Sequence, residues 1–201
     1  MNKTIAVALT GASGITYGLR LVECLLAADV RVGLLYSKAA RIVAQQEMDF
    51  ALPERADETQ RQLSAHFGVD DGRLTVYGIE DWFAPLASGS GAPDAMVICP
   101  CSMGTLAKVA AGLADDLIAR AADVALKEAR RLILVPRETP LSAIHLENML
   151  KLSRAGAVIL PPSPGFYHHP KSVAEMVDFV VARILDQLGV EHALVPRWAA
   201  G

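Results

Sequence analysis

The sequence lacks the marks of several large classes of protein. Its net charge is −3 and it has no basic run, which argues against a nucleic-acid partner. No apolar stretch reaches the ~18 residues of a membrane span, so we expect no membrane association. Three cysteines are too few and too closely placed for a disulfide framework. The chain opens without a charged region, apolar core and cleavage site, and we therefore expect a reducing, cytoplasmic location.

The chain also lacks the phosphate motifs of two common nucleotide-binding classes. It has no G-x-x-x-x-G-K-[ST] sequence, which excludes a P-loop. The stretch "LTGASGITYG" at 9–18 has the spacing G-x-x-G, with Ile15 where a dinucleotide fingerprint has its third glycine. The next strand-like run ends in Tyr36, Ser37 and Lys38, without the acid that binds a ribose 2′-OH. These differences argue against a nicotinamide dinucleotide.

A second feature of short-chain dehydrogenases is only superficially present. Tyr167 and Lys171 have the Tyr-x-x-x-Lys spacing of those enzymes. That chemistry needs both side chains on one helical face, but Pro170 lies between them and Gly165 just before them. A proline inside a helix costs ~3 kcal/mol because it removes a hydrogen bond and clashes with the preceding turn. The dehydrogenase interpretation is therefore disfavoured.

What the chain does have is a regular alternation of apolar runs. Strands are predicted at 3–10, 30–36, 94–99, 131–135 and 156–160, and helices at 15–28, 38–47, 102–112, 121–129, 140–153 and 172–188. Residues 53–73 predict an exposed helix, and 84–94 a flexible loop. Because strands and helices alternate and the strands are apolar throughout, we expect an α/β fold with a doubly wound parallel sheet. The prediction is a single flavodoxin-like (Rossmann-like) domain over residues 1–201.

Polar or small residues follow four of the predicted strands. They are Gly11–Ser13, Ser37, Cys101–Thr105 and Arg137–Glu138. In open parallel sheets ligands bind beyond the carboxyl ends of the strands, so these segments are expected to converge on one site. The N–H groups of a strand-to-helix turn favour an anion. A mononucleotide such as FMN fits this set, although any tight strand-to-helix turn also favours glycine.

Three long segments carry a resemblance to a known family. They are "ICPCSMGTLAKVAAGLADDLIARAADVALKE" (98–128), "LVPRETPLSAIHLENMLKLSRAGAVILPPSPGFYH" (134–168) and "VDFVVARILD" (177–186). The sequence resembles the UbiX family of flavin prenyltransferases from about residue 3 to Trp198. The resemblance implies transfer of the dimethylallyl group of dimethylallyl monophosphate to N5 and then C6 of reduced FMN. It also implies a homo-dodecamer with sites between subunits, and delivery of the prenylated FMN to a UbiD-type decarboxylase.

The resemblance also implies roles for individual residues. The FMN-binding positions are Gly11, Ala12, Ser13, Ser37, Ser102, Met103, Gly104, Thr105 and Arg137. The dimethylallyl phosphate site is matched by Lys127, Tyr167 and Arg183. The catalytic positions are Ser13, Glu47, Lys127, Glu138 and Trp198, and Trp82 is a further aromatic near the site. From residue chemistry, Glu138 can carry a proton provided that burial raises its pKa, and a tryptophan face can stabilise an allylic cation.

No metal is expected in this reaction. Prenyl transfer from a diphosphate usually relies on Mg²⁺ held by D-D-x-x-D, and neither Asp70–Asp71 nor Asp115–Asp116 completes that motif. The His168–His169 and His145/Glu147 pairs have no partners at ligand spacing. Protein cations must then meet the charge of the departing phosphate.

Each of these assignments has a plainer alternative. Arg183 on an amphipathic helix can be a solvated charge, and Lys127 an exposed helix end. The two tryptophans can be packing residues, and the cysteines core filling. Two alternative functions also stay open, an FMN-dependent cysteine decarboxylase and a non-catalytic FMN carrier for a decarboxylase. A hydrophobic content of 52% also suggests large apolar interfaces between subunits.

Overall fold

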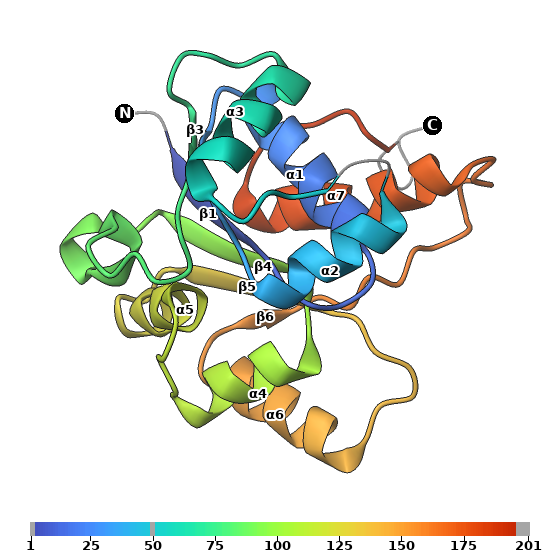
Figure 1. Ribbon diagram of the computed structural model, residues 1–201. Helices are drawn as coiled ribbons and strands as arrows, with labels where there is room; N and C mark the ends of the chain where they lie inside the picture. Colours follow the sequence, from blue (N-terminus) through green and yellow to red (C-terminus); the bar gives the residue numbers. More distant parts are fainter. Residues whose placement is uncertain (1–2, 49–50, 196–201) are drawn as a thin grey trace.

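A parallel β-sheet forms the centre of the protein, whose computed structural model describes residues 3–48 and 51–195 (Figure 1). Its strands are β1 (Thr4–Leu9), β2 (Arg31–Tyr36), β3 (Leu74–Val76), β4 (Ala95–Cys101), β5 (Arg131–Pro136) and β6 (Val158–Ile159). They lie in the order β3-β2-β1-β4-β5-β6, and every pair is parallel. Residues 5–9 of β1 are fully buried, because helices cover both faces of the sheet. The doubly wound fold is confirmed, and the strand order is the Rossmann one.

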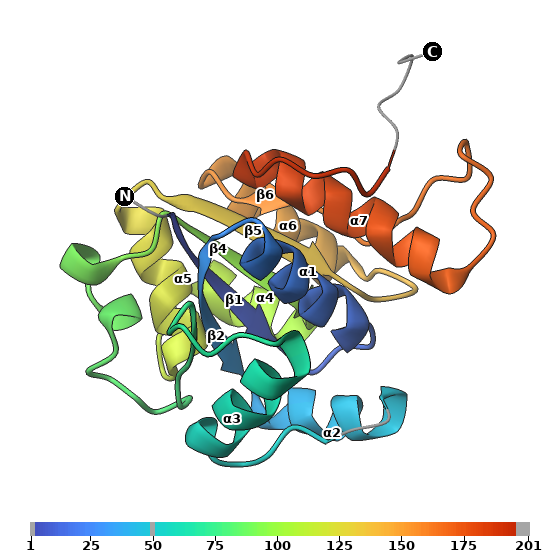
Figure 2. The same cartoon turned by 90° about the horizontal axis from the view of Figure 1, so that it is seen from above.

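Two layers of helices cover the sheet. One layer contains α1 (Ile15–Ala27), α2 (Lys38–Glu47), α3 (Ala56–Phe67) and α7 (Val173–Leu188). The other contains α4 (Met103–Ala111), α5 (Leu117–Lys127) and α6 (Ala143–Arg154). Figure 2 shows α1 and α7 side by side across β1 and β4. The two layers enclose separate apolar cores, one on each face of the sheet.

The structure corrects three expectations about the elements. The polar segment predicted as one exposed helix over 53–73 is the shorter helix α3, and strand β3, which was not predicted, follows it. Helix α5 begins four residues before the predicted 121, because Asp116 caps it by accepting a hydrogen bond from Ala119 N at 2.8 Å. The loop predicted at 84–94 contains two short 3₁₀ turns, η1 (Pro85–Ala87) and η2 (Gly89–Gly91).

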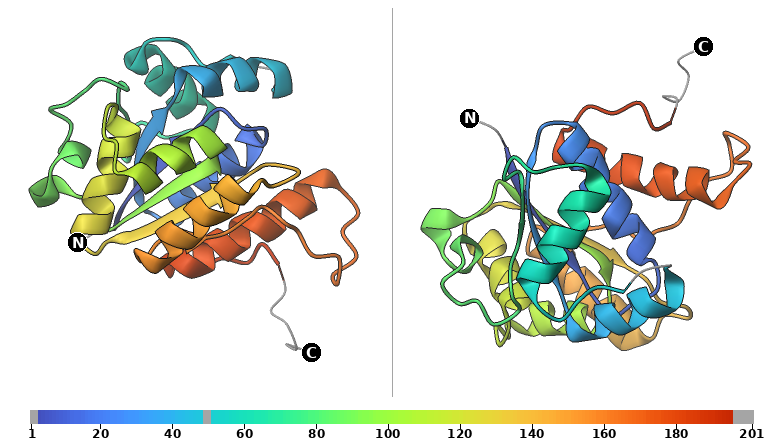
Figure 3. Two further views of the ribbon diagram at one scale, coloured as in Figure 1. Left: turned by 90° about the horizontal axis from the view of Figure 1, so that it is seen from below. Right: turned by 45° about the horizontal axis from the view of Figure 1, so that its top comes forward.

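The segment between β6 and α7 stands out from the body of the molecule. It leaves the carboxyl edge of the sheet and projects away before α7 returns across the sheet (Figure 3). The end of α7 reaches the opposite edge, where the Lys3 ammonium donates to the Leu188 carbonyl. Within residues 3–48 and 51–195, no helix has both the length and the apolar character needed to cross a membrane.

Candidate active site

Hydrogen bonds join the carboxyl ends of β1, β2, β4 and β5. Ser37 N donates to Leu9 O at 3.0 Å, and Arg137 N donates to Cys101 O at 3.3 Å. Thr10, fully buried, links β1 to β4, since its hydroxyl donates to Pro100 O at 2.8 Å and accepts from Ser102 N at 2.8 Å. The four predicted segments therefore do meet at one edge. Thr10 lies within the 9–18 stretch, but no pattern in the sequence predicts this linking role, which is apparent only from its burial in the structure.

Two serines at this edge cap helices. The Ser37 hydroxyl accepts from Ala40 N at 3.1 Å and begins α2. The Ser102 hydroxyl accepts from Thr105 N at 3.2 Å and lies 3.0 Å from the Thr105 hydroxyl, which begins α4. Each helix thus presents its positive end to the same edge, an arrangement that attracts a phosphate.

The loop between β1 and α1 lies close to α2. A Cβ on Gly11 would come within 2.4 Å of Ala39 Cβ, so only glycine permits this approach. Ala12 is buried and Ser13 exposed, which leaves the Ser13 side chain toward solvent at the edge. A Cβ on Gly104 would meet no atom within 4 Å, so the surface above the α4 N-terminus is open. Met103 below it is buried.

The N-terminus of α1 binds the carboxylate of the protein's own Glu47. The Glu47 carboxylate accepts hydrogen bonds from Gly14 N at 2.9 Å and from Ile15 N at 3.2 Å. The expectation that this turn and helix end favour an anion is right, but these two N–H groups are already used. A phosphate at this edge is left with the N-termini of α2 and α4 and with the Gly11–Ser13 backbone.

Arg137 and Glu138 follow β5 at the same edge. The Arg137 Nε is buried and has no hydrogen-bond partner among the described residues. A buried guanidinium nitrogen without a partner is costly, and an anionic or carbonyl-bearing ligand would satisfy it. Glu138 is exposed and accepts from its neighbour Thr139 N at 3.0 Å, so one chain does not provide the burial on which its predicted proton-carrier role depends. The donor set of this edge therefore fits the phosphate and polar groups of FMN.

The predicted substrate residues lie elsewhere in the chain. Tyr167 is 78% exposed on the projecting segment. Its neighbour His168 stacks on Phe179 of α7 with ring centroids 5.4 Å apart and planes 4° apart. A Cβ on Gly165 would lie 3.3 Å from the Phe179 ring and 3.4 Å from the Tyr167 ring. Arg183 lies one turn beyond Phe179 on the same helix. The projecting segment and α7 thus bring Tyr167 and Arg183 to one side of the molecule.

Lys127 lies at the opposite edge of the sheet. It ends α5, pairs with Glu128 and lies close to Gly89 of η2, in the loop that leads to the start of β4. Trp82 is 46% exposed in the loop after β3. Trp198 lies outside the described residues. One chain therefore gathers the predicted cofactor residues at one edge together with Ser13, Glu47 and Glu138, while Lys127, Tyr167 and Arg183 lie elsewhere on its surface.

Other polar residues singled out in the sequence have structural roles. Asp115 and Asp116 both pair with Lys108, at 2.8 and 2.7 Å. The His145 side chain accepts from Ser142 N at 3.2 Å in a capping box at the start of α6. Within residues 3–48 and 51–195, no group of three or more His, Cys, Asp or Glu side chains is placed to hold a metal ion.

The cysteines at the end of β4 are core residues, as expected. Cys99 and Cys101 are fully buried. Burial raises the pKa of the Cys101 thiol to about 12, and it raises the pKa of Cys99 as well. Both thiols therefore stay protonated and unreactive at neutral pH.

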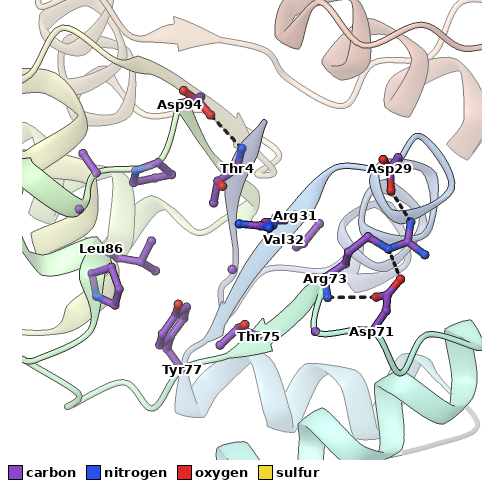
Figure 4. A pocket seen from close by; sticks show the side chains of 16 residues that line it. Thr4, Asp29, Arg31, Val32, Asp71, Arg73, Thr75, Tyr77, Leu86 and Asp94 are labelled. Carbon is purple, nitrogen blue, oxygen red and sulfur yellow. Dashed lines mark hydrogen bonds and ion pairs between the residues drawn. The ribbon is translucent and has the colours of Figure 1, made fainter. Parts of the chain in front are cut away.

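A cavity of about 630 Å³ lies at the amino edge of the sheet, away from these loops. Figure 4 shows Arg73 between Asp29 and Asp71, with Asp94 beside Thr4. The Arg73 guanidinium lies 3.2 Å from Asp29 and 2.6 Å from Asp71, and Asp94 accepts from Thr4 N at 2.8 Å. The charged groups joined by dashed lines thus pair with one another across the starts of the strands, and we assign this cavity no ligand.

Comparison with known proteins assigns the family. A family model described as Flavoprotein matches residues 1–185. The flavin prenyltransferase UbiX of Pseudomonas aeruginosa is 59% identical over 194 residues, covering 96% of this chain and 93% of that protein. The UbiX of Alkalihalophilus pseudofirmus is 48% identical over 98% of this chain and 97% of its own length.

Solved structures agree. The crystal structure of AnUbiX in complex with FMN and dimethylallyl pyrophosphate superposes with a TM-score of 0.89 at 42% identity, covering both chains fully. A cysteine decarboxylase of thioviridamide biosynthesis is similar in fold alone, with a TM-score of 0.57 and 20% identity over 79% of this chain and 90% of its own. Identity over the full length thus separates the two flavoprotein branches, and this chain belongs to the UbiX family of flavin prenyltransferases.

Proposed function

We propose that this protein transfers the dimethylallyl group of dimethylallyl monophosphate to reduced FMN. The observation that carries the proposal is the edge where β1, β2, β4 and β5 end. There, Ser37 and Ser102 place two helix N-termini beside the buried Arg137 Nε, which no group in the described part of the chain satisfies. Such an edge fits a flavin mononucleotide, and the family assignment gives the reaction.

The cofactor-binding roles follow from what each group offers. The N-termini of α2 and α4 supply N–H groups and positive helix ends for the FMN phosphate. Gly11 lets the loop after β1 approach Ala39 of α2 closely, and we place the Gly11–Ala12 backbone of this loop beside the cofactor. Arg137 donates to a flavin oxygen or to phosphate, which satisfies its buried nitrogen.

When bound, reduced FMN would supply N5 as the nucleophile for the allylic carbon that leaves phosphate, and C6 for the ring closure that follows. The chain's own residues supply the rest. Ser13, exposed at the edge, donates a hydrogen bond near the flavin. Glu138 accepts or returns a proton at the edge, where its carboxylate is accessible. Glu47 is held by two backbone N–H groups of α1, which fixes a negative charge beside the loop.

The two cations assigned to the leaving phosphate, Lys127 and Arg183, do not lie at the FMN edge of the described chain. Lys127 lies at the amino edge, and Arg183 lies on α7 beyond the projecting Tyr167 segment. We propose that a second copy of the chain completes each site, in a homo-dodecamer. A UbiX-like protein of Escherichia coli that is described as dodecameric and FMN-dependent supports this, with a TM-score of 0.85 and 44% identity over 98% of this chain and 99% of its own. Trp82 and Trp198 then offer aromatic faces to the allylic cation.

Two alternatives are weaker. A cysteine decarboxylase needs a different substrate, and such proteins share only the fold with this chain. A non-catalytic carrier would have to bind FMN at this edge, but it would have no use for Tyr167 and Arg183, which match a substrate phosphate site. Delivery of the product to a UbiD-type decarboxylase, in the cytoplasm, belongs to the same proposal.

The deciding experiment is incubation of the protein with reduced FMN and dimethylallyl monophosphate under anaerobic conditions, followed by mass measurement of the extracted flavin. We expect a gain of one dimethylallyl unit, unchanged by EDTA, because protein cations rather than a metal meet the phosphate charge. Arg183→Ala should bind FMN but lose most activity, since arginine grips phosphate in two places. Unchanged flavin mass with the wild-type protein contradicts the proposed function.

The choice of phosphate donor is tested in the same assay. AnUbiX was crystallised with dimethylallyl pyrophosphate, so both donors are compared with and without Mg²⁺. We expect the monophosphate to be the better substrate, because it brings less charge to neutralise. Activity that EDTA abolishes and Mg²⁺ restores would overturn the metal-free proposal.

A further inference from the structure

The end of α7 carries a chain of polar contacts that leads to Arg183. The Asp186 carboxylate uses both oxygens: Oδ2 lies 2.5 Å from Arg183 Nη2, and Oδ1 lies 3.1 Å from His192 Nε2. All three side chains line one cavity of about 490 Å³. The carboxylate thus joins the predicted phosphate-binding arginine to the segment that follows the helix.

The fold brings His192 back to the helix it has just left. Gly189 ends α7 with φ +62°, a conformation that favours glycine, and Val190 N donates to Leu185 O at 3.0 Å. The chain then runs back along α7, as Figures 1 and 2 show. Val190 is buried, and only 12% of the His192 side chain is exposed. The imidazole is therefore a fixed part of this end of the molecule.

The hydrogen bonds of His192 fix its tautomer. Leu194 N donates to His192 Nδ1 at 3.4 Å, so Nδ1 carries no proton. The proton of the neutral ring is then on Nε2, which donates to Asp186 Oδ1. Three contacts therefore follow one another: Leu194 N donates to His192, His192 donates to Asp186, and Asp186 pairs with Arg183.

This position is a costly one for an acid. Asp186 lies in the last turn of α7, where the helix dipole disfavours a negative charge. An ordinary surface ion pair on a helix contributes little stability and offsets only part of this cost. The Arg183–Asp186 pair differs from an ordinary surface pair because the largely buried His192 hydrogen-bonds to the second carboxylate oxygen of Asp186.

We propose that Asp186 and His192 are positioning residues that hold the Arg183 guanidinium ready for the substrate phosphate, an inference that rests on the proposed function. A guanidinium has five N–H donors, and the bond to Asp186 uses one of them. The remaining donors stay available on a half-exposed side chain. Because the side chain is already ordered, binding phosphate loses less rotamer freedom, and the affinity for the substrate rises.

The test is Asp186→Asn in the FMN-loaded protein, with kcat and KM measured for dimethylallyl monophosphate. An amide keeps the shape but provides a single oxygen acceptor, so it cannot hold both partners. We expect KM to rise about tenfold, the effect of losing one hydrogen bond to a charged group, with unchanged FMN content and little change in kcat. Asp186→Glu, which keeps the charge, should recover part of the loss, and His192→Phe should raise KM in the same direction.

A double variant shows whether Asp186 acts through Arg183. In an Arg183→Ala background, adding Asp186→Asn should change KM no further. The matched control is Asp178→Asn, which removes another α7 pair, the one with Arg20 at 2.7 Å, and should leave KM unaltered. Equal KM for Asp186→Asn and wild type, or losses that add in the double variant, would overturn the inference. A wild-type protein that makes no product instead contradicts the proposed function itself.

Discussion

At the scale of single residues, the candidate site uses side chains that also hold the backbone. Ser37 and Ser102 cap helices, Thr10 joins two strands, and Glu47 holds the start of α1. Truncating these side chains does not separate their functional and structural roles, because loss of a helix cap alone lowers stability by roughly 0.5–2 kcal/mol. A substitution that keeps the structural role and changes only the charge is more informative.

Ser37→Asp is such a change. Aspartate caps a helix as well as serine does, so α2 should keep its N-terminus and the fold should survive. The added charge lies where we place the FMN phosphate, and like charges in contact should weaken FMN binding more than tenfold. The measurement is the visible absorbance of flavin that remains with the purified protein.

The control for Ser37→Asp is the same change at another cap. Ser172 begins α7 by accepting from Glu175 N at 3.2 Å and has no part in the proposed cofactor site. Ser172→Asp should retain flavin. If Ser37→Asp also keeps its full flavin content, the phosphate does not lie at the start of α2.

At the scale of elements, α1 is placed by a close contact with β4. A Cβ on Gly18 would lie 2.3 Å from the Cys99 carbonyl oxygen and 2.3 Å from Leu9 Cδ2. The carbonyl belongs to the backbone of a central strand and cannot move aside. The absence of a side chain at residue 18 therefore sets how closely α1, and with it the turn at Gly11–Ser13, lies to the sheet.

Gly18→Ala should consequently destabilise the protein although alanine favours helices. Overpacking costs about 1–3 kcal/mol, against a gain of about 1 kcal/mol in helix propensity. We expect a lower thermal midpoint and weaker flavin retention. Gly78→Ala, where a Cβ meets nothing within 4 Å, is the control and should leave the midpoint unchanged. A midpoint for Gly18→Ala equal to that of wild type would show that α1 shifts without cost.

At the scale of the whole molecule, large apolar side chains remain exposed on and beside α6. They include Ile144 at 67%, Leu146 at 53% and Leu150 at 51% exposure. Several exposed large apolar side chains on one helix of a folded chain are typical of a protein interface. Together with the dispersed substrate residues, it supports the proposal that the functional unit contains several copies of the chain.

Light scattering tests the proposed assembly. The wild-type protein at micromolar concentration should have the mass of a dodecamer. Ile144→Glu should lower that mass, because a charge in an apolar contact is costly to desolvate. Ile42, 57% exposed on α2, which covers the other face of the sheet from α6, provides a matched control in Ile42→Glu. A monomer mass for the wild type would contradict the dodecamer.

Local sequence patterns determined most of the fold. Buried apolar runs placed β1, β2, β4 and β5 nearly at their observed bounds, and the predicted helix 38–47 coincides with α2. The rule that ligands bind beyond the carboxyl ends of parallel strands likewise placed the predicted cofactor segments at one edge. β3 was missed because three residues carry too little periodicity to distinguish a strand from a loop.

Tertiary structure alone decided how distant residues meet. Glu47 fills the start of α1 across 33 residues, and Thr10 joins Ser102 across 92. Asp186 meets His192 only because the chain turns back at Gly189. Periodicity and capping act within a few residues and leave a trace in the sequence. A hydrogen bond between segments depends on how their elements pack, and no local pattern records it.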